Sequence, residues 1–255
     1  MPGGGEGIDI KSGSRNGVVE GNSVWNLVQL GIYIDAYRAG ASNIKVRANR
    51  IWRTYMGIVI NSEQGGTVAD VDVSDNLIHD VGYHGILIDD LKKERGGDGP
   101  RQQIRIYNNT IVSAGVKEAK PPYCRLWSNP CIDSGLGIKV ATTNITGLDI
   151  HDNIILDAKS MPMMIEPAIR SSSRIERNLV WSQVPSSLTR DFIGSSPIIA
   201  DPLLVDAAGG DYRLQPGSPA IGTGVGGAPL GRDITGRQRP ANGPIDLGAF
   251  MFVAN

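Results

Sequence analysis

Val46-Arg47-Ala48-Asn49-Arg50-Ile51 and Val73-Ser74-Asp75-Asn76-Leu77-Ile78 are two copies of one pattern, 27 residues apart. In each copy, a β-branched residue stands three positions before an asparagine and another stands two positions after it. Columns of this kind predict short strands that stack in register, each burying one layer of side chains. The asparagines are then expected to form an internal ladder of side-chain amides at one turn. Four further copies are centred on Asn22, Asn109, Asn153 and Asn178.

A second short strand recurs in the repeats, with the form Gly-Ile-x-Ile. Its first and third apolar positions are expected to point inward and the middle one outward. A repeat of about 25 residues with strands of this length is typical of a parallel β-solenoid, and the leucine spacing and helix of a leucine-rich repeat are missing. We therefore predict an all-β fold, a right-handed parallel β-helix, whose hand follows the rule for parallel crossovers. The copies are Gly7–Ile10, Gly31–Ile34, Gly57–Ile60, Gly85–Ile88 and Gly137–Val140.

Composition agrees with this fold and excludes several partners. The chain has 255 residues with 33 glycines and only 3 phenylalanines, which suits many tight turns around thin aliphatic layers. With 25 basic and 26 acidic residues, no charge excess recruits a nucleic acid or an anionic membrane. No apolar run is long enough to span a bilayer. No signal peptide is visible, and because no cap precedes Gly7, we expect earlier coils before it.

The chain divides at about residue 198. Residues 1–197 are predicted to form the coils, and residues 198–255 an irregular C-terminal segment. Asp201-Pro202-Leu203 and Pro216-Gly217-Ser218-Pro219 resemble the C-terminal segment of many bacterial right-handed β-helix proteins, where it packs against the last coils. The chain thus resembles the pectin-lyase-like superfamily, which implies a carbohydrate-active protein that is secreted or at the cell surface.

Cysteine and histidine usage predicts no metal centre. Cys124 and Cys131, the only two cysteines, are too few for a zinc site; they form either a disulfide that pins a loop or two separate thiols. The three histidines are expected to be structural or to line a groove. No cofactor is expected.

The outer face after the Gly-Ile-x-Ile strands is the predicted site. Carboxylates flanked by tyrosines suit a glycan, since acids act on the glycosidic bond and aromatic rings pack on sugar faces. Asp35, expected to be exposed, is the first candidate carboxylate, with Asp9, Glu63 or Asp89 as its partner. The Asp35–Asp89 separation, about 9–10 Å over two coils, is close to that of inverting glycosidases. The candidates are Asp35, Asp9, Glu63, Asp89 and Lys11 for catalysis, and Glu6, Tyr33, Tyr37, Asn61 and His84 for substrate binding.

The first prediction is therefore a glycoside hydrolase that acts on a polysaccharide or oligosaccharide. The protein is expected to be a monomer. Two alternative functions stay open. Glu6-Gly7-Ile8-Asp9-Ile10-Lys11-Ser12 resembles the E-x-I-x-x-K-S segment of the chondroitinase B and alginate lyase family. That resemblance implies a polysaccharide lyase with Lys11 as the base, and Ca²⁺ would be needed to screen the acidic groove from a polyuronate. The other alternative is a non-catalytic carbohydrate-binding or surface module. A buried carboxyl with a raised pKa would favour catalysis, and fully solvated acids beside tyrosines would favour binding.

Overall fold

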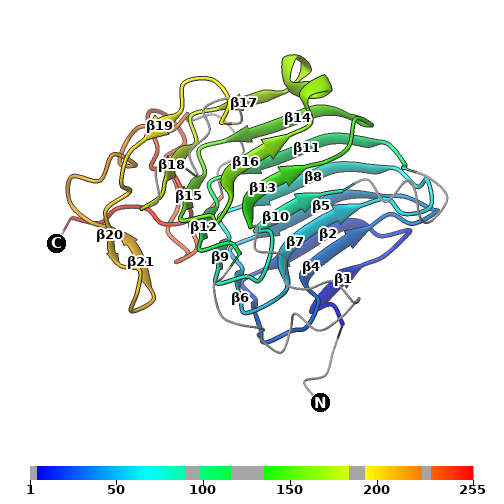
Figure 1. Cartoon of the computed structure of the whole chain (residues 1–255), viewed down its shortest axis with the longest axis horizontal. Helices are drawn as coiled ribbons and strands as arrows, with labels where there is room; N and C mark the ends of the chain where they lie inside the picture. The colour runs from blue at the N-terminus through cyan, green and yellow to red at the C-terminus, as the bar shows by residue number, and fades with distance from the viewer. Residues whose placement is uncertain (1–4, 90–97, 116–134, 184–192, 226–230, 255) are drawn as a thin grey trace.

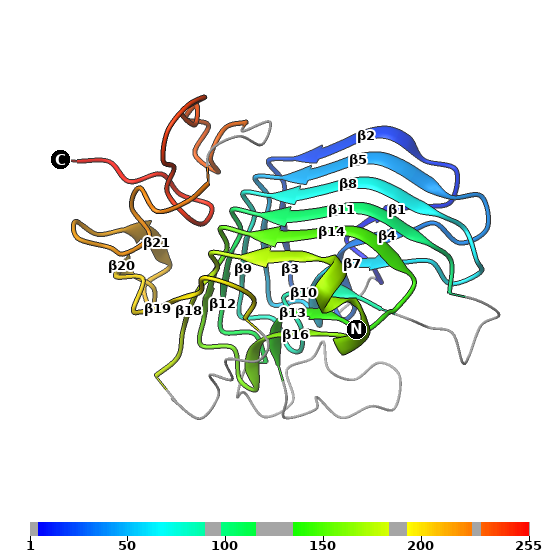
Figure 2. The same ribbon diagram turned by 90° about the horizontal axis from the view of Figure 1, so that it is seen from above.

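The chain winds into a solenoid with three parallel β-sheets (Figure 1). The computed structural model describes residues 5–89, 98–115, 135–183, 193–225 and 231–254. Each coil gives one strand to each sheet, and consecutive coils lie directly above one another (Figure 2). The predicted right-handed parallel β-helix is confirmed.

The strands of each sheet follow one another one coil apart. The first sheet contains β1 (Ile8–Ile10), β4 (Leu30–Asp35), β7 (Met56–Asn61), β10 (Ile86–Ile88), β13 (Leu136–Val140) and β16 (Met161–Ile165). The second contains β2 (Arg15–Glu20), β5 (Ala41–Arg47), β8 (Val68–Ser74), β11 (Arg101–Tyr107), β14 (Ile145–His151) and β17 (Arg174–Glu176). The third contains β3 (Ser23–Trp25), β6 (Arg50–Trp52), β9 (Leu77–His79), β12 (Thr110–Val112), β15 (Ile154–Leu156), β18 (Leu179–Trp181) and β19 (Ile198–Ile199). A 3-10 helix, η3 (Pro167–Ser172), and an antiparallel hairpin of β20 (Leu204–Asp206) and β21 (Asp211–Leu214) complete the described elements.

The asparagine ladder runs through the turn between the second and third sheets. The Asn76 side-chain amide donates to Asn109 Oδ1 at 2.9 Å and to the Val46 carbonyl at 2.9 Å. Its oxygen accepts from both the backbone and the side-chain nitrogen of Asn49. The same bonds recur along Asn22, Asn49, Asn76, Asn109, Asn153 and Asn178, so the predicted ladder is confirmed.

The residue before each ladder asparagine makes this sharp turn possible. Ala48, Asp75 and Arg177 have φ values of 54°, 55° and 54°, in the left-handed region. L-residues adopt that region at some cost, and the repeated asparagine bonds compensate for it.

The glycine of each Gly-Ile-x-Ile strand allows the coils to approach closely. A Cβ at Gly57 would lie 2.4 Å from the Gly85 carbonyl oxygen and 2.7 Å from Ile78 Cγ2. A side chain at this position would therefore push neighbouring coils apart. Behind these glycines, the inward isoleucines and valines of all three sheets form one continuous core.

Charged residues of alternating sign stack on the outer face of the second sheet. Lys45 pairs in register with Asp72, Asp72 with Arg105, and Arg105 with Asp149. Arg174 extends this column, with its guanidinium 3.1 Å from Asp149. Unlike charges in register support the stacking that the core drives.

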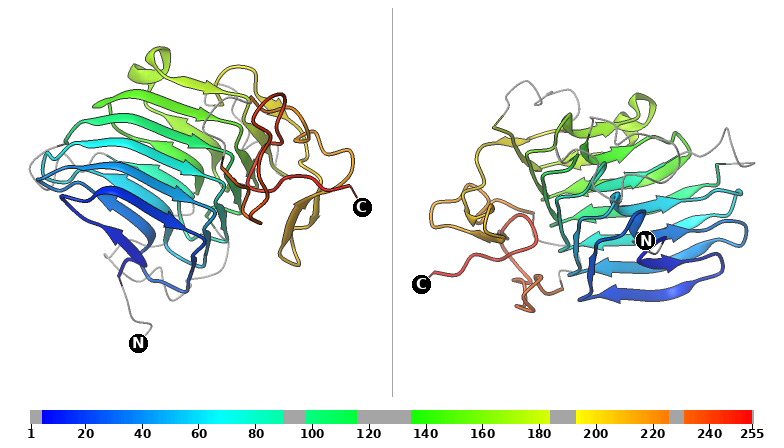
Figure 3. Two further views of the ribbon diagram at one scale, coloured as in Figure 1. Left: turned by 180° about the vertical axis from the view of Figure 1, so that it is seen from behind. Right: turned by 60° about the horizontal axis from the view of Figure 1, so that its bottom comes forward.

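The C-terminal segment lies along the outer face of the third sheet (Figure 3). The buried Arg239 guanidinium contacts the buried Asp75 carboxylate at 2.7 and 2.8 Å. Further along the stack, Val225 N donates to Asp152 Oδ2 and Ala249 N donates to Thr110 Oγ1, both at 2.9 Å. These bonds tie the segment to several successive coils. Among the residues described, no helix is long and apolar enough to cross a bilayer.

Replacing Asn76 with alanine should destabilise the protein by about 3–5 kcal/mol, because it leaves several buried donors and acceptors of adjacent coils without partners. Urea unfolding followed by circular dichroism measures this loss. Asn22→Ala is the matched control, since Asn22 lies at the less buried end of the ladder and should cost about 1 kcal/mol. Equal losses for the two variants would contradict a ladder whose strength comes from burial.

Candidate functional site

The outer face of the first sheet presents parallel rows of side chains, of which two concern the site. The central row contains Tyr33, Val59 and Leu87, which form a cluster separate from the solenoid core. These side chains are almost fully buried, although they point away from the core. One flanking row brings together Lys11, Asp35 and Asn61, because the register pairs Asp35 with Asn61 and aligns Ile10 with Ile34. Polar groups thus border an apolar strip over the first coils.

Asp35 is the most shielded carboxylate of this face. The expectation that Asp35 is exposed is wrong: the residue is only 2% exposed. Its Oδ1 accepts a hydrogen bond of 2.9 Å from the backbone nitrogen of Tyr37. Burial raises its pKa, and the charge of Glu63 adds to the rise; the backbone hydrogen bonds and Lys11 offset it only in part. Asp35 therefore holds a proton more readily than an ordinary aspartate does.

Lys11 bridges Asp35 to Asp9. The ammonium lies 3.0 Å from Asp9 Oδ2 and 3.6 Å from Asp35 Oδ2, and 4.9 Å from the centroid of the Tyr33 ring. The Lys11 side chain is 56% exposed and that of Asp9 is 27% exposed. Burial acts to lower the pKa of Lys11, but the hydrogen bond to Asp9 and the negative charges of Asp9, Asp35 and Glu6 outweigh it, so that the pKa is raised.

Tyr33 and Glu63 form a second polar pair above the apolar strip. The Tyr33 hydroxyl donates to Glu63 Oε1 at 2.6 Å, and Asn61 Nδ2 approaches that hydroxyl at 3.4 Å. Burial and the bond to Glu63 raise the pKa of Tyr33, so the phenol stays protonated. Glu63 is thereby drawn over the central row and faces the same surface as Asp35.

The other predicted residues occupy the edges of this face. Tyr37 is exposed, with the Arg38 guanidinium 5.4 Å from its ring centroid. Glu6 contributes to the field around Lys11. Asp89 lies two coils from Asp35, and its backbone carbonyl accepts a bond from Arg101. The structure brings together Asp9, Lys11, Tyr33, Asp35, Asn61 and Glu63.

Arg101 is an organising residue that the sequence analysis missed. It is fully buried, donates to Asn61 Oδ1 at 3.0 Å and to the Gly99 carbonyl at 2.7 Å, and pairs with the Asp98 carboxylate. It therefore fixes Asn61 within the row that contains Asp35. A signal was present in the sequence, because the register places this arginine in a column with Val68 and Ile145, where an apolar residue is expected.

Arg101→Met should destabilise the protein by about 3–5 kcal/mol, because it leaves the Asp98 carboxylate buried without its cation. The free energy of unfolding in urea measures this. Arg105→Met is the matched control on the same strand: its partly exposed ion pair with Asp72 should contribute about 1 kcal/mol or less. A loss at Arg101 no greater than that at Arg105 would contradict the organising role.

His84 lies buried on the same face, on the far side of the central row from Asp35. Its ring stacks on Tyr83 with 3.6 Å between centroids, and its Nδ1 accepts from Leu136 N at 3.3 Å. Burial lowers its pKa to about 3, and the charge of Lys139 acts in the same direction. His84 is therefore neutral at physiological pH and does not act as a cationic acid.

This neutral histidine should make stability fall as the pH is lowered. Unfolded His84 binds a proton below about pH 6.5, whereas the folded ring resists protonation until about pH 3. The resulting loss should be about 2 kcal/mol at pH 5 relative to pH 8. Unfolding of the wild type and of His84→Gln at both pH values measures it, and the variant should lose that much less. His79→Gln serves as the control, and a wild-type-like pH response in His84→Gln would refute the assignment.

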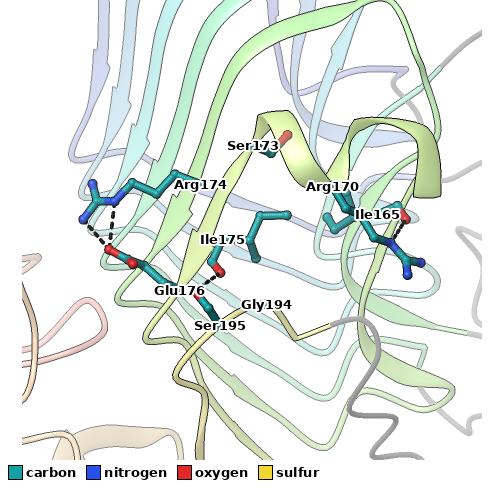
Figure 4. Close-up of a pocket in the computed structure, with 8 residues that line it drawn as sticks. All are labelled: Ile165, Arg170, Ser173, Arg174, Ile175, Glu176, Gly194 and Ser195. Carbon is teal, nitrogen blue, oxygen red and sulfur yellow. Dashed lines mark hydrogen bonds and ion pairs between the residues drawn. The ribbon is translucent and has the colours of Figure 1, made fainter.

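A hollow of about 550 Å³ lies elsewhere, at the C-terminal end of the solenoid. Figure 4 shows Ile165, Ile175 and Arg174 around it, with Arg174 hydrogen-bonded to Glu176 at 2.8 Å. The Glu176 carboxylate is thus already paired with a cation. The other residues that line the hollow do not supply an acid and a base. Because the acid–base chemistry lies on the first sheet, we place the candidate site there and not at this hollow.

No group of histidine, cysteine or carboxylate side chains suited to a metal ion occurs within the described ranges. Cys124 and Cys131, for which a disulfide and two separate thiols were both left open, lie outside those ranges.

Comparison with known proteins bears on the N-terminal part of the chain. A family model described as a right-handed β-helix region matches residues 3–111, from the first coil to β12. Such regions occur in polysaccharide-degrading enzymes and in other proteins. No curated protein matches the chain significantly. The similarity to the chondroitinase B and alginate lyase family stays a prediction.

Proposed function

We propose that the protein cleaves a polysaccharide on the outer face of the first sheet, as a glycoside hydrolase with Asp35 as the acid and Asp9 as its partner. The observation that carries this proposal is the contrast between the two carboxyls that Lys11 bridges. Asp35 is buried with a raised pKa, and Asp9 is partly exposed beside the ammonium. Two carboxyls in different environments can divide the roles of acid and nucleophile or base.

The spacing of these carboxyls favours a retaining mechanism. Because one ammonium contacts both, their Oδ2 atoms can be no further apart than its two contact distances of 3.0 and 3.6 Å combined. Retaining glycosidases hold their carboxyls about 5–5.5 Å apart, and inverting ones about 6.5–9.5 Å. That upper bound only just reaches the inverting range, so the Asp9–Asp35 pair favours the shorter class, whereas the Asp35–Asp89 pair was expected near the longer one.

The steps follow from these positions. Asp35 transfers its proton to the glycosidic oxygen as the bond to the leaving sugar breaks, and the Asp9 carboxylate bonds to the anomeric carbon. A water molecule then gives its proton to Asp35, and its oxygen displaces Asp9. The substrate reaches Asp35 by displacing the Lys11 ammonium, which sits on a flexible, exposed chain. The Tyr33–Glu63 pair and Asn61 bind sugar hydroxyls beside it.

Lys11 is poorly suited to be the base of a lyase. A lysine base must lose its proton near neutral pH, and this requires a lowered pKa. The carboxylates around Lys11 raise its pKa instead. The same negative charge disfavours a polyuronate, so we propose a neutral glycan as substrate. We propose further that the protein acts on this polymer outside the cell and as a monomer.

Asp35→Asn and Asp9→Asn should each lower hydrolysis by at least about a thousandfold. Release of reducing ends from a panel of neutral polysaccharides measures this, with circular dichroism to verify folding. Asp89→Asn, the same change two coils away, should retain most of the activity. Asp70→Asn controls for loss of an exposed carboxylate on another sheet.

Four results would reject this assignment. Wild-type activity in folded Asp35→Asn would remove the acid, and loss in Asp89→Asn equal to that in Asp35→Asn would restore the longer pair. Ultraviolet absorbance of unsaturated uronates on alginate, pectate or chondroitin, with or without Ca²⁺, would establish a lyase. Absence of both signals from a folded sample would favour a binding module.

A further inference from the structure

A second cavity of about 550 Å³ lies between the third sheet and the C-terminal hairpin. We define the flank groove as this cavity. Its floor is a column of the third sheet that runs in register from His79 through Val112 and Leu156 to Trp181. The opposite wall contains Leu204 and Tyr212, from β20 and β21. Two segments far apart in the sequence thus build a cleft on a different sheet from Asp35.

Aromatic rings stand at both ends of this apolar floor. The rings of His79 and Tyr212 are 4.9 Å apart and tilted by 39°. Trp181 lines the other end and is only partly buried. Apolar C–H faces of a sugar pack well on such rings, and the volume lies within the roughly 300–1,000 Å³ of small-molecule sites.

The rim of the groove is acidic. Asp80, Asp157 and Asp201 line it, and among the described residues that line it none is a lysine or arginine. Each carboxylate is oriented by a bond that it accepts: from His79 Nδ1 at 2.8 Å, from Gln183 N at 2.8 Å, and from Leu203 N at 2.9 Å, respectively. A carboxylate has acceptor positions beyond one bond, and hydroxyl groups are suitable donors for them.

We infer that the flank groove binds one or two units of a neutral glycan, separately from the surface that contains Asp35. The rings and the aliphatic floor contact the sugar faces, and the rim carboxylates accept bonds from its hydroxyls. The rim carboxylates disfavour uronates and sulfated sugars through like-charge repulsion. The groove serves to hold the polymer on the flank of the solenoid, and this inference does not depend on the protein being a hydrolase.

Isothermal titration calorimetry with cellobiose, maltose, xylobiose and diacetylchitobiose tests the groove. At least one should bind wild-type protein with a Kd below about 1 mM. Trp181→Ala should weaken that binding at least tenfold, and Asp201→Asn, at an exposed position that does not endanger folding, about threefold or more. Trp25→Ala is the matched control, because Trp25 belongs to the same column but lies outside the groove and is 49% exposed.

Two charged compounds complete the panel: digalacturonate, an anionic sugar, and choline, a cation. The inference is overturned if no neutral sugar binds, if either charged compound binds more tightly than every neutral one, or if folded Trp181→Ala and Asp201→Asn bind as the wild type does. Calorimetry detects binding whether or not the protein turns over a substrate. A failure of the proposed hydrolysis therefore leaves this test intact, and loss of binding in Trp181→Ala with unchanged hydrolysis would separate the two sites.

Discussion

Stacking of one coil on the next is the constraint on which the rest of this structure depends. Parallel strands lie about 4.8 Å apart, so the side chain at each position of a coil contacts the side chain at the equivalent position of the next coil. Inside the solenoid this repetition gives the ladder in which Asn76 bonds to both Asn49 and Asn109, and the glycine column in which Gly57 approaches Gly85. Polar amides can be buried at the turn because every member satisfies its neighbours.

The same repetition creates the chemistry of the outer faces. Lys11 and Asp35 become neighbours because they occupy one column of adjacent coils, and the exposed ammonium contacts the buried carboxylate. On the third sheet, the column of Trp25, Trp52 and His79 stacks its rings in the same way, with 5.2 and 5.7 Å between centroids. Differences between coils then decide which part of a column is structural and which part carries a site.

The C-terminal segment adds what a repeat alone does not supply. A regular solenoid has flat outer faces, and a cleft requires a second wall. The hairpin of β20 and β21 supplies this wall beside the third sheet, and Arg239 anchors the segment through its buried contact with Asp75. The flank groove therefore depends on residues that do not follow the repeat.

The sequence alone determined the solenoid, its register, the asparagine ladder and the column that joins Lys11 to Asp35, because these follow from a period that is visible along the chain. It also brought Asp9, Tyr33 and Glu63 to one face. The burial of Asp35, the Arg101 network behind Asn61 and the neutral state of His84 were decided by the tertiary structure alone. Each of these depends on which side chains cover a given position, and that coverage comes from irregular residues between the repeats, such as Glu63, Asp98 and Gly99. A periodic pattern specifies which residues are stacked, but it contains no information about the irregular segments that shield them from water.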